Sequence, residues 1–179
     1  MTSVPSIPAT REALFAFLDA HGIAHRTYQH PPVFRVEDGA EIKAAMPGGH
    51  TKNLFLRDKK NNVYLVTAEE DADIDLKGLH RVLGASGRFS FGSAELMLEL
   101  LGVAPGSVTP LGVLHDTQGR INVVLDAALM EHDTINCHPL VNTMTTNLKR
   151  EDLVKFLEAT GHSPRITRVS GVSAEADAD

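Results

Sequence analysis

The stretch of this chain best suited to chemistry is a short loop, Gly106-Ser107-Val108-Thr109-Pro110. Glycine adopts backbone angles that other residues avoid and lets a ligand approach the main chain, whereas proline fixes φ and has no N–H. The residues between them carry N–H groups and two hydroxyls, which can bind an anion or a developing oxyanion. Taken alone, however, a Gly/Pro pair most often marks a tight turn, and these residues favour that interpretation.

Two side chains elsewhere could serve such chemistry. Lys52 begins a strongly apolar segment, where a lysine can hold a phosphate as a point charge, although a solvated lysine is the simpler interpretation. Asn53 points to the opposite face in a regular strand, unless a bulge re-aims it. His138 precedes Pro139 at the expected end of a strand, and a structural role explains it as well as a chemical one.

Other kinds of site find little support. The chain has no Gly-rich phosphate motif, and its nine histidines show no recognised zinc spacing, so we expect no metal and no cofactor. The single cysteine, Cys137, excludes an internal disulfide. Its neighbour His138 faces the other side of a strand, so we expect a buried structural cysteine and not a nucleophile. Asp126, at the end of a strand, is either a cap or an acid.

Composition describes a soluble globular protein. The 179 residues are 42% hydrophobic and 22% charged, and no apolar run approaches the ~20 residues of a membrane span. The N-terminus lacks the pattern of a signal peptide, so we expect a cytoplasmic location and no membrane partner. The net charge of −6 argues against a stable DNA complex. Local basic groups, such as the one over residues 52–60, are most simply solvated faces, with limited phosphate contact left open.

The elements that must position these residues alternate irregularly between helix and strand. Thr10 and Ser93 are expected helix caps, Gly22, Gly102 and Gly161 are expected stops, and residues 58–62 are an expected hairpin turn. We predict helices over residues 11–21, 36–45, 76–83, 94–101 and 150–160. We predict strands over 24–29, 53–57, 63–67, 112–115, 121–125, 134–138, 142–148 and 166–169.

Without a regular βαβ rhythm, these elements indicate an α+β fold with a mixed or largely antiparallel sheet. We expect a single domain over residues 1–169. Residues 170–179 carry acids and no base, and we expect them to form a flexible tail.

Several of these segments together resemble the YbaK/prolyl-tRNA synthetase-associated domain superfamily, and within it the free-standing Ala-tRNA(Pro) deacylases (PrdX or ProXp-ala). The likeness covers about residues 9–165. It is carried by Thr51-Lys52-Asn53-Leu54-Phe55-Leu56, Asp75-Leu76-Lys77, Phe89-Ser90-Phe91, the loop 106–110 as a Gly-x-x-x-Pro motif, and His138-Pro139-Leu140. Any one segment alone is a weak signal, but the set is fairly specific.

The resemblance implies one α+β domain with a curved, mixed and mostly antiparallel sheet surrounded by helices. It implies hydrolysis of alanine wrongly esterified to the tRNA for proline, with the acceptor end of an aminoacyl-tRNA as substrate and prolyl-tRNA synthetase as a candidate transient partner. By motif, the catalytic residues are Lys52, Gly106 and His138. The substrate-binding residues are Asn53, Ser107, Val108, Thr109 and Pro110.

The chemistry of that reaction suits these residues. An aminoacyl ester is already activated, so the protein must orient it, donate hydrogen bonds to the oxyanion and exclude the wrong amino acid. Two alternatives stay open. The first is a deacylase that acts on another small aminoacyl group, such as Cys, Ser or Thr. The second is a non-catalytic module that binds tRNA or another nucleic acid.

Overall fold

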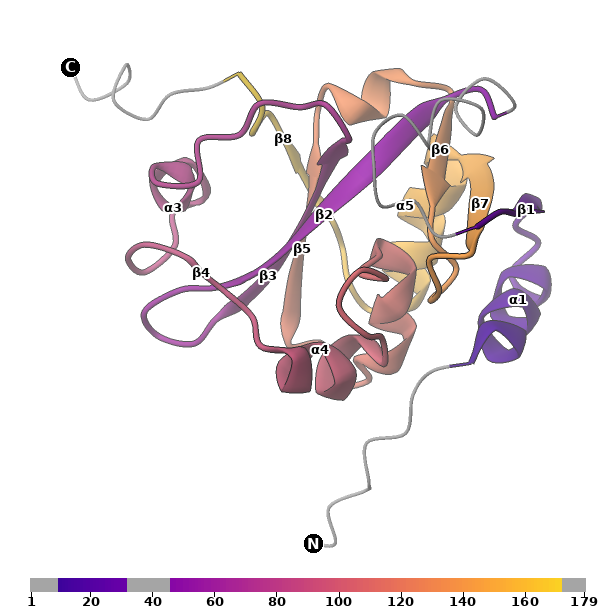
Figure 1. Ribbon diagram of the computed structural model, residues 1–179, viewed down its shortest axis with the longest axis horizontal. Helices are drawn as coiled ribbons and strands as arrows, with labels where there is room; N and C mark the ends of the chain where they lie inside the picture. Colours follow the sequence, from indigo (N-terminus) through magenta and orange to yellow (C-terminus); the bar gives the residue numbers. More distant parts are fainter. Residues whose placement is uncertain (1–9, 32–45, 172–179) are drawn as a thin grey trace, which may run out of the picture.

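An antiparallel hairpin forms the centre of the fold. In the computed structural model, which describes residues 10–31 and 46–171, β2 (Gly49–Arg57) pairs with β3 (Val63–Glu69). The register runs without a break from Thr51 opposite Glu69 to Arg57 opposite Val63. Apolar side chains occupy both faces of the hairpin because each face is covered by a separate part of the core. The hairpin that the sequence predicts is therefore confirmed (Figure 1).

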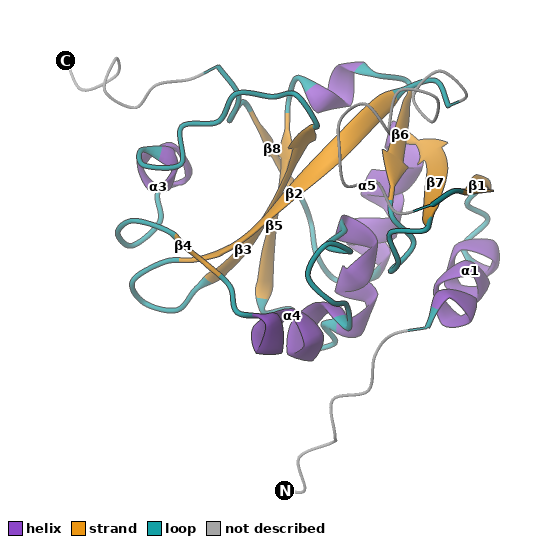
Figure 2. Ribbon diagram, in the orientation of Figure 1, coloured by secondary structure: helices purple, strands orange, loops and turns teal. Residues whose placement is uncertain are grey.

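The other strands extend this hairpin into one mixed sheet in the order β1-β7-β6-β2-β3-β5-β8, with β4 paired to β2 (Figure 2). The pairs β2–β6, β3–β5 and β5–β8 are parallel, and the remaining pairs are antiparallel. This confirms the predicted mixed sheet. The additional strands are β1 (His25–Gln29), β4 (Ser90–Phe91), β5 (Ile121–Asp126), β6 (Thr134–Cys137), β7 (Met144–Lys149) and β8 (Arg165–Thr167).

Helices pack around the sheet, and their ends follow the predicted capping residues. Thr10 accepts a hydrogen bond from the Ala13 N–H, and Ser93 accepts one from the Leu96 N–H. No helix in residues 10–31 and 46–171 has the length and apolar content to cross a membrane. The helices are α1 (Arg11–Ala20), α3 (Leu79–Leu83), α4 (Ala94–Leu101) and α5 (Arg150–Ala159), with short 3₁₀ helices η2 (Pro110–His115) and η3 (Leu129–Glu131).

Two predicted elements are wrong. Residues 112–115 are not a strand but the end of η2, because Pro110 supplies a helical φ and the Thr109 hydroxyl accepts from the Leu111 N–H. The helix predicted over 76–83 begins only at Leu79, since Leu76 is exposed and the buried stripe is confined to Leu79 and Leu83. The helix predicted over 36–45 lies outside the described residues.

The C-terminal segment is attached to the domain as far as the structure describes it. Ser170 forms an isolated bridge with Ile74 and donates its hydroxyl to Asp126. The Gly171 N–H bonds to the Asp73 carbonyl. Asp126 therefore fastens Ser170 to the end of β5. The rest of the expected tail, residues 172–179, lies outside the described residues.

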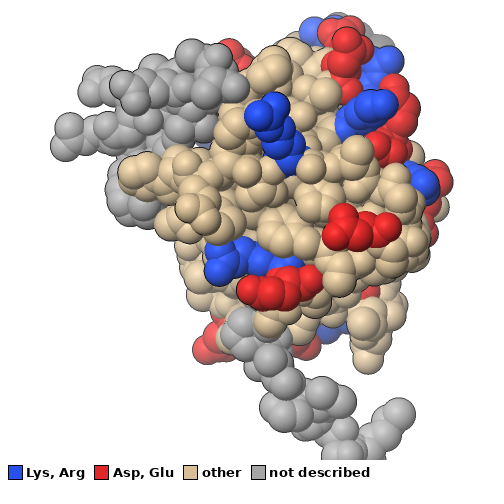
Figure 3. Space-filling model, turned by 90° about the vertical axis from the view of Figure 1, so that its right-hand side faces the viewer, with Lys and Arg blue, Asp and Glu red and all other residues tan. Residues whose placement is uncertain are grey.

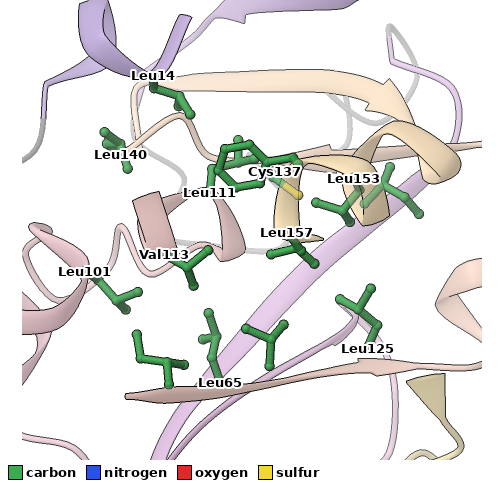
Figure 4. Packing of buried hydrophobic residues seen from close by; sticks show 14 of the residues in the cluster. Leu14, Leu65, Leu101, Leu111, Val113, Leu125, Cys137, Leu140, Leu153 and Leu157 are labelled. Atoms are coloured by element: carbon green, nitrogen blue, oxygen red, sulfur yellow. The ribbon is translucent and has the colours of Figure 1, made fainter. Parts of the chain in front are cut away.

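A separate hydrophobic cluster packs on each face of the sheet. The larger cluster joins α1, α4, η2 and α5 to residues such as Phe55, Leu65, Leu125 and Cys137 (Figure 4). The smaller one packs Leu56, Val66 and Val124 under α3. Burial raises the pKa of the Cys137 thiol to about 12, so this cysteine stays protonated at neutral pH and acts as a small apolar core residue.

The β2–β3 turn is organised by a buried carboxylate, Asp58. It accepts hydrogen bonds from the backbone N–H groups of Lys60, Asn62 and Ser86 and from the Asn62 side-chain amide, all within 2.9–3.0 Å. Burial opposes ionisation of Asp58, but these four donors outweigh it and hold its pKa below the ordinary value.

We predict that Asp58→Ala lowers the free energy of unfolding by about 1–3 kcal/mol at pH 7, because several donors lose a charged acceptor. A depressed folded-state pKa stabilises the fold above the unfolded value near 4, and this contribution disappears as pH falls through the folded-state pKa. Urea denaturation should therefore show that the difference in free energy of unfolding between Asp58→Ala and wild type is smaller in acid than at pH 7. Asp71→Ala, at an exposed position, is the control; a difference that grows in acid would contradict the role of Asp58.

Candidate functional site

The middle of β2 has an open edge. Gly49 and His50 pair with β6 at one end, and Leu56 and Arg57 pair with β4 at the other. Among the described residues no strand pairs with the stretch between them, residues 51–55, on that side. The Phe55 carbonyl accepts from the Gly92 N–H there, and backbone groups alternate along a strand. The backbone N–H and C=O of Asn53, two residues earlier, therefore face the same opening.

The Gly106–Pro110 loop is fastened to this edge by Asn53. The Asn53 side-chain amide donates to the Val108 carbonyl at 2.9 Å, and the Thr67 hydroxyl donates to Asn53 Oδ1 at 2.7 Å. A carbonyl can only accept, so the NH₂ of Asn53 must face Val108 and its oxygen must face Thr67. The hairpin thus holds both the position and the orientation of the amide that supports the loop.

The loop presents its backbone more than its side chains. Gly106 has a φ of +92°, which favours glycine, and the nearest atom to a Cβ at this position is Asn142 Nδ2 at 3.8 Å. The Ser107 N–H bonds to the Ala104 carbonyl, whereas those of Gly106, Val108 and Thr109 have no acceptor among the described residues. The Thr109 hydroxyl is fully buried and caps η2, which leaves it no reach toward a ligand.

Lys52 lies on the opposite face of β2 from Asn53. The register contains no bulge, so adjacent residues alternate between faces. The Lys52 ammonium donates to the carbonyl of Ala72, just beyond β3. Glu70, whose N–H bonds to the His50 carbonyl at 2.9 Å, shares this face of the hairpin. Two layers therefore flank the open edge, with Lys52 and Glu70 on one face and Asn53 with its loop on the other.

His138 follows β6 and is turned toward β7. Its Nδ1 lies 3.1 Å from the Met144 carbonyl, which can only accept, so Nδ1 carries the proton and Nε2 is the basic nitrogen of the neutral ring. Burial lowers the pKa of His138, and nearby His30 lowers it further, while the Met144 carbonyl and Glu70 act in the opposite direction. With the net pKa below the ordinary value, the imidazole is neutral at pH 7.

An open groove of about 480 Å³ lies next to this histidine, lined by Gln29, His30, Thr143 and Met144. The His30 Nδ1 bonds to the Pro31 carbonyl at 2.8 Å, and its Nε2 bonds to the Thr145 hydroxyl at 2.7 Å. Both ring nitrogens are thus engaged, and His30 serves to fix the wall of the groove.

The structure brings several predicted residues together. Asn53, Val108 and Gly106 meet around the loop, next to Asn142, and Lys52 lies behind Asn53 on the other face. The link to His138 is indirect, through Glu70 and through the chain that leads on to Asn142. No group of three or more metal-ligating side chains occurs in the described part of the chain.

Three residues at the site were not among those predicted: Thr67, Glu70 and His30. Thr67 was readable, because the predicted turn over 58–62 places it opposite Asn53, as a polar residue in an apolar strand. Glu70 and His30 carried no such signal. Glu70 and His30 are distant from His138 in the sequence, and they belong to the site because both affect the pKa of His138.

Solved structures place the fold in a known class. A protein described as a candidate trans-editing enzyme for prolyl-tRNA synthetase superposes with a TM-score of 0.69, over 96% of this chain and 100% of that one. Its sequence is 21% identical, so this likeness concerns the fold alone. The domain is thus of the mixed-sheet α+β class seen in that structure.

The sequence comparisons establish the family. Residues 30–156 match the sequence model of the aminoacyl-tRNA editing domain, and the chain belongs to this family. The prolyl-tRNA synthetase associated domain-containing protein 1 of Bos taurus is 41% identical, over 87% of this chain and 93% of its own length. The prolyl-tRNA editing protein ProX of Acetoanaerobium sticklandii is 36% identical, over 86% of this chain and 93% of its own length.

We predict that Asn53→Asp frees the loop. The carboxylate still accepts from Thr67 but places an acceptor against the Val108 carbonyl, so the bond becomes a repulsion. Hydrogen exchange followed by mass spectrometry should show about tenfold faster exchange in a peptide covering 104–110, through the Ser107 N–H that bonds to the Ala104 carbonyl. A tenfold change equals a loss of about 1.4 kcal/mol.

Asn122→Asp is the matched control, because the Asn122 amide donates to the Val63 carbonyl at 3.0 Å on β5, away from the loop. It should leave exchange in 104–110 unchanged. Equal exchange in Asn53→Asp and wild type would show that this bond does not hold the loop.

Proposed function

We propose that this protein is a trans-editing hydrolase that removes alanine from mischarged Ala-tRNA(Pro). The observation that carries the proposal is the Gly106–Pro110 loop, fastened by Asn53 to an open strand edge with backbone N–H groups that have no acceptor among the described residues. Membership of the editing-domain family and the 36% identity to a protein named as a prolyl-tRNA editing protein support the same activity.

Catalysis in this proposal depends on preorganised hydrogen bonds. The N–H groups of Gly106 and Val108 donate to the ester carbonyl as negative charge develops on its oxygen. Water attacks the carbonyl carbon, the ester bond breaks, and the ribose hydroxyl leaves with a proton. The vicinal ribose hydroxyl assists this water. The neutral Nε2 of His138 is a second acceptor that can orient the water or the substrate's amino group.

Lys52 holds the terminal phosphate or ribose in this proposal. Its ammonium carries three donors, of which one is directed to the Ala72 carbonyl. That contact holds the ammonium beside the segment that follows β3 and leaves further donors for an oxygen of the nucleic acid. A lysine serves here as a point charge, without the planar geometry of arginine.

Selection between alanine and proline depends on the size of the pocket. A synthetase pocket built for proline cannot strongly reject a smaller amino acid, because each missing methylene changes binding by only ~1–3 kcal/mol. A small editing pocket excludes proline by overlap, which a packed wall resists. The substrate is the acceptor end of the tRNA, with prolyl-tRNA synthetase as a transient partner and the cytoplasm as the location.

A panel of aminoacyl-tRNAs tests the activity. We expect release of alanine from Ala-tRNA(Pro) and retention of proline on Pro-tRNA(Pro), followed as loss of labelled amino acid from tRNA. Lys52→Ala should reduce kcat/KM by a hundredfold or more, because the positioning charge is lost. Preferred release of Cys, Ser or Thr would favour the alternative deacylase, and tRNA binding without any hydrolysis would favour a binding module. Wild-type turnover by Lys52→Ala would contradict the role of this lysine.

The loop conformation gives a second, matched test. Gly106→Ala forces alanine to a φ of +92° and should lower kcat/KM about a hundredfold by displacing the loop donors. Gly119→Ala imposes the same kind of strain at a φ of +66° in the turn before β5, with no atom within 4 Å of the added Cβ. Both variants should lose about 1 kcal/mol of stability. If Gly119→Ala is as inactive as Gly106→Ala, lost stability and not loop geometry explains the effect.

A further inference from the structure

A basic patch with an exposed aromatic ring lies at the far end of β2 from the candidate site. It comprises Arg57 at the end of β2, Lys59 and Lys60 of the β2–β3 turn, Arg88 in the segment that leads into β4, and Phe91 of β4. We call these five residues the turn patch. The two segments lie side by side, because the Lys59 N–H bonds to the Ser86 carbonyl at 2.8 Å and Arg57 pairs with Ser90 (Figure 1).

The charge of the turn patch is available to a ligand. Lys60 and Arg88 are exposed and have no hydrogen-bond or ion-pair partner among the described residues, and Arg57 makes only a 3.4 Å bond to the Ser90 hydroxyl. The one acid in residues 57–62 and 86–91 is Asp58, which is buried beneath the turn with four donors of its own. Cations are thus gathered here in a chain whose net charge is −6.

The aromatic ring adds a second kind of contact. Phe91 has 61% of its surface exposed, although large apolar side chains are usually buried. It lies opposite Leu56 on β2, so it shares the face of Lys52, which is four residues earlier and therefore on the same side of the strand. By the same alternation Arg57 lies on the other face of β2, so the cations and the ring occupy both sides of this end of the strand. Exposed cations together with an exposed ring match surfaces on which nucleic-acid bases stack while phosphates bind the cations.

The side of the molecule opposite the turn patch shows no comparable concentration of positive charge in Figure 3. Figure 3 shows the side of α1 and β1, where basic and acidic side chains are mixed around a largely uncharged middle. A polyanion therefore finds a concentrated positive surface at the turn patch and not on the visible part of that face.

We propose that the turn patch binds the acceptor stem of the tRNA whose 3′ end enters the candidate site. This proposal rests on the proposed function. Arg57 lies four positions after Asn53 along the strand, a distance of about 13 Å. A stacked strand carries one phosphate per about 3.4 Å, so this distance matches the few unpaired nucleotides that end every tRNA. The stem then begins at the patch, with its phosphates on Lys60 and Arg88 and Phe91 against an exposed base.

The test measures binding separately from hydrolysis. Fluorescence anisotropy with unacylated tRNA(Pro) should show that Lys60→Gln/Arg88→Gln binds at least tenfold more weakly than wild type. The slope of log K against log salt should become shallower by about 1.5, because two phosphate contacts are lost. Phe91→Ala should weaken binding without changing that slope, and Phe91→Tyr should restore it.

The control removes equal charge elsewhere. Lys149→Gln/Lys155→Gln changes two exposed lysines near α5, where Glu151 and Glu158 flank Lys155, and it should bind tRNA as wild type does. A 3′-alanylated CCA trinucleotide reaches the site but not the patch, so Lys60→Gln/Arg88→Gln should hydrolyse it at the wild-type kcat/KM.

The outcomes separate the two proposals. If Lys60→Gln/Arg88→Gln binds tRNA with wild-type affinity and salt slope, the turn patch is not the stem-binding surface, whatever the enzyme hydrolyses. A wild-type protein that binds tRNA through the patch but releases no amino acid would overturn the proposed function and leave the surface standing.

Discussion

The hydrogen bond from the Asn53 amide to the Val108 carbonyl is the contact on which the candidate site depends. It joins a strand at the centre of the sheet to a loop that is also held by the Ser107 bond to Ala104 and by the burial of Thr109. Its direction is set by Thr67, which occupies the amide oxygen from the neighbouring strand. The Asn53 amide therefore fixes the backbone of the Gly106–Pro110 loop to the rigid β2–β3 hairpin.

The opening next to the loop arises from the topology of the sheet. β2 is long enough to pair with β6 at its beginning and with β4 at its end, and the edge between these partners is left unpaired. An unpaired edge is usually a hazard, because it exposes backbone donors and acceptors to other chains. Here the Asn53 side chain fastens the Gly106–Pro110 loop next to this edge.

The sequence predicted what depends on local chemistry. Thr10 and Ser93 cap their helices as expected, and the turn around Asp58 sets a register that places Asn53 opposite Thr67. The apolar run after Pro110 was misread, because the Thr109 cap and proline favour a 3₁₀ helix over a strand.

Contacts between distant segments could not be read in this way. The Ala72 carbonyl that holds Lys52, the parallel pairing of β3 with β5 and the surroundings of His138 depend on tertiary packing. Part of the candidate site therefore follows from local sequence, and part depends on the topology of the sheet. Its motif residues are visible in the sequence, whereas the faces on which Lys52 and Asn53 lie require the sheet.

The most direct measurement is a crystal structure with a non-hydrolysable substrate analogue, 3′-deoxy-3′-alanylamido-adenosine, in which an amide replaces the ester. The expected result is an alanyl carbonyl oxygen within about 3 Å of the Gly106 or Val108 N–H, as an oxyanion-type contact requires. The Asn53 bond to Val108 should be unchanged in that complex. An analogue bound away from the Gly106–Pro110 loop, or with its carbonyl directed elsewhere, would contradict the assignment of this loop as the catalytic wall.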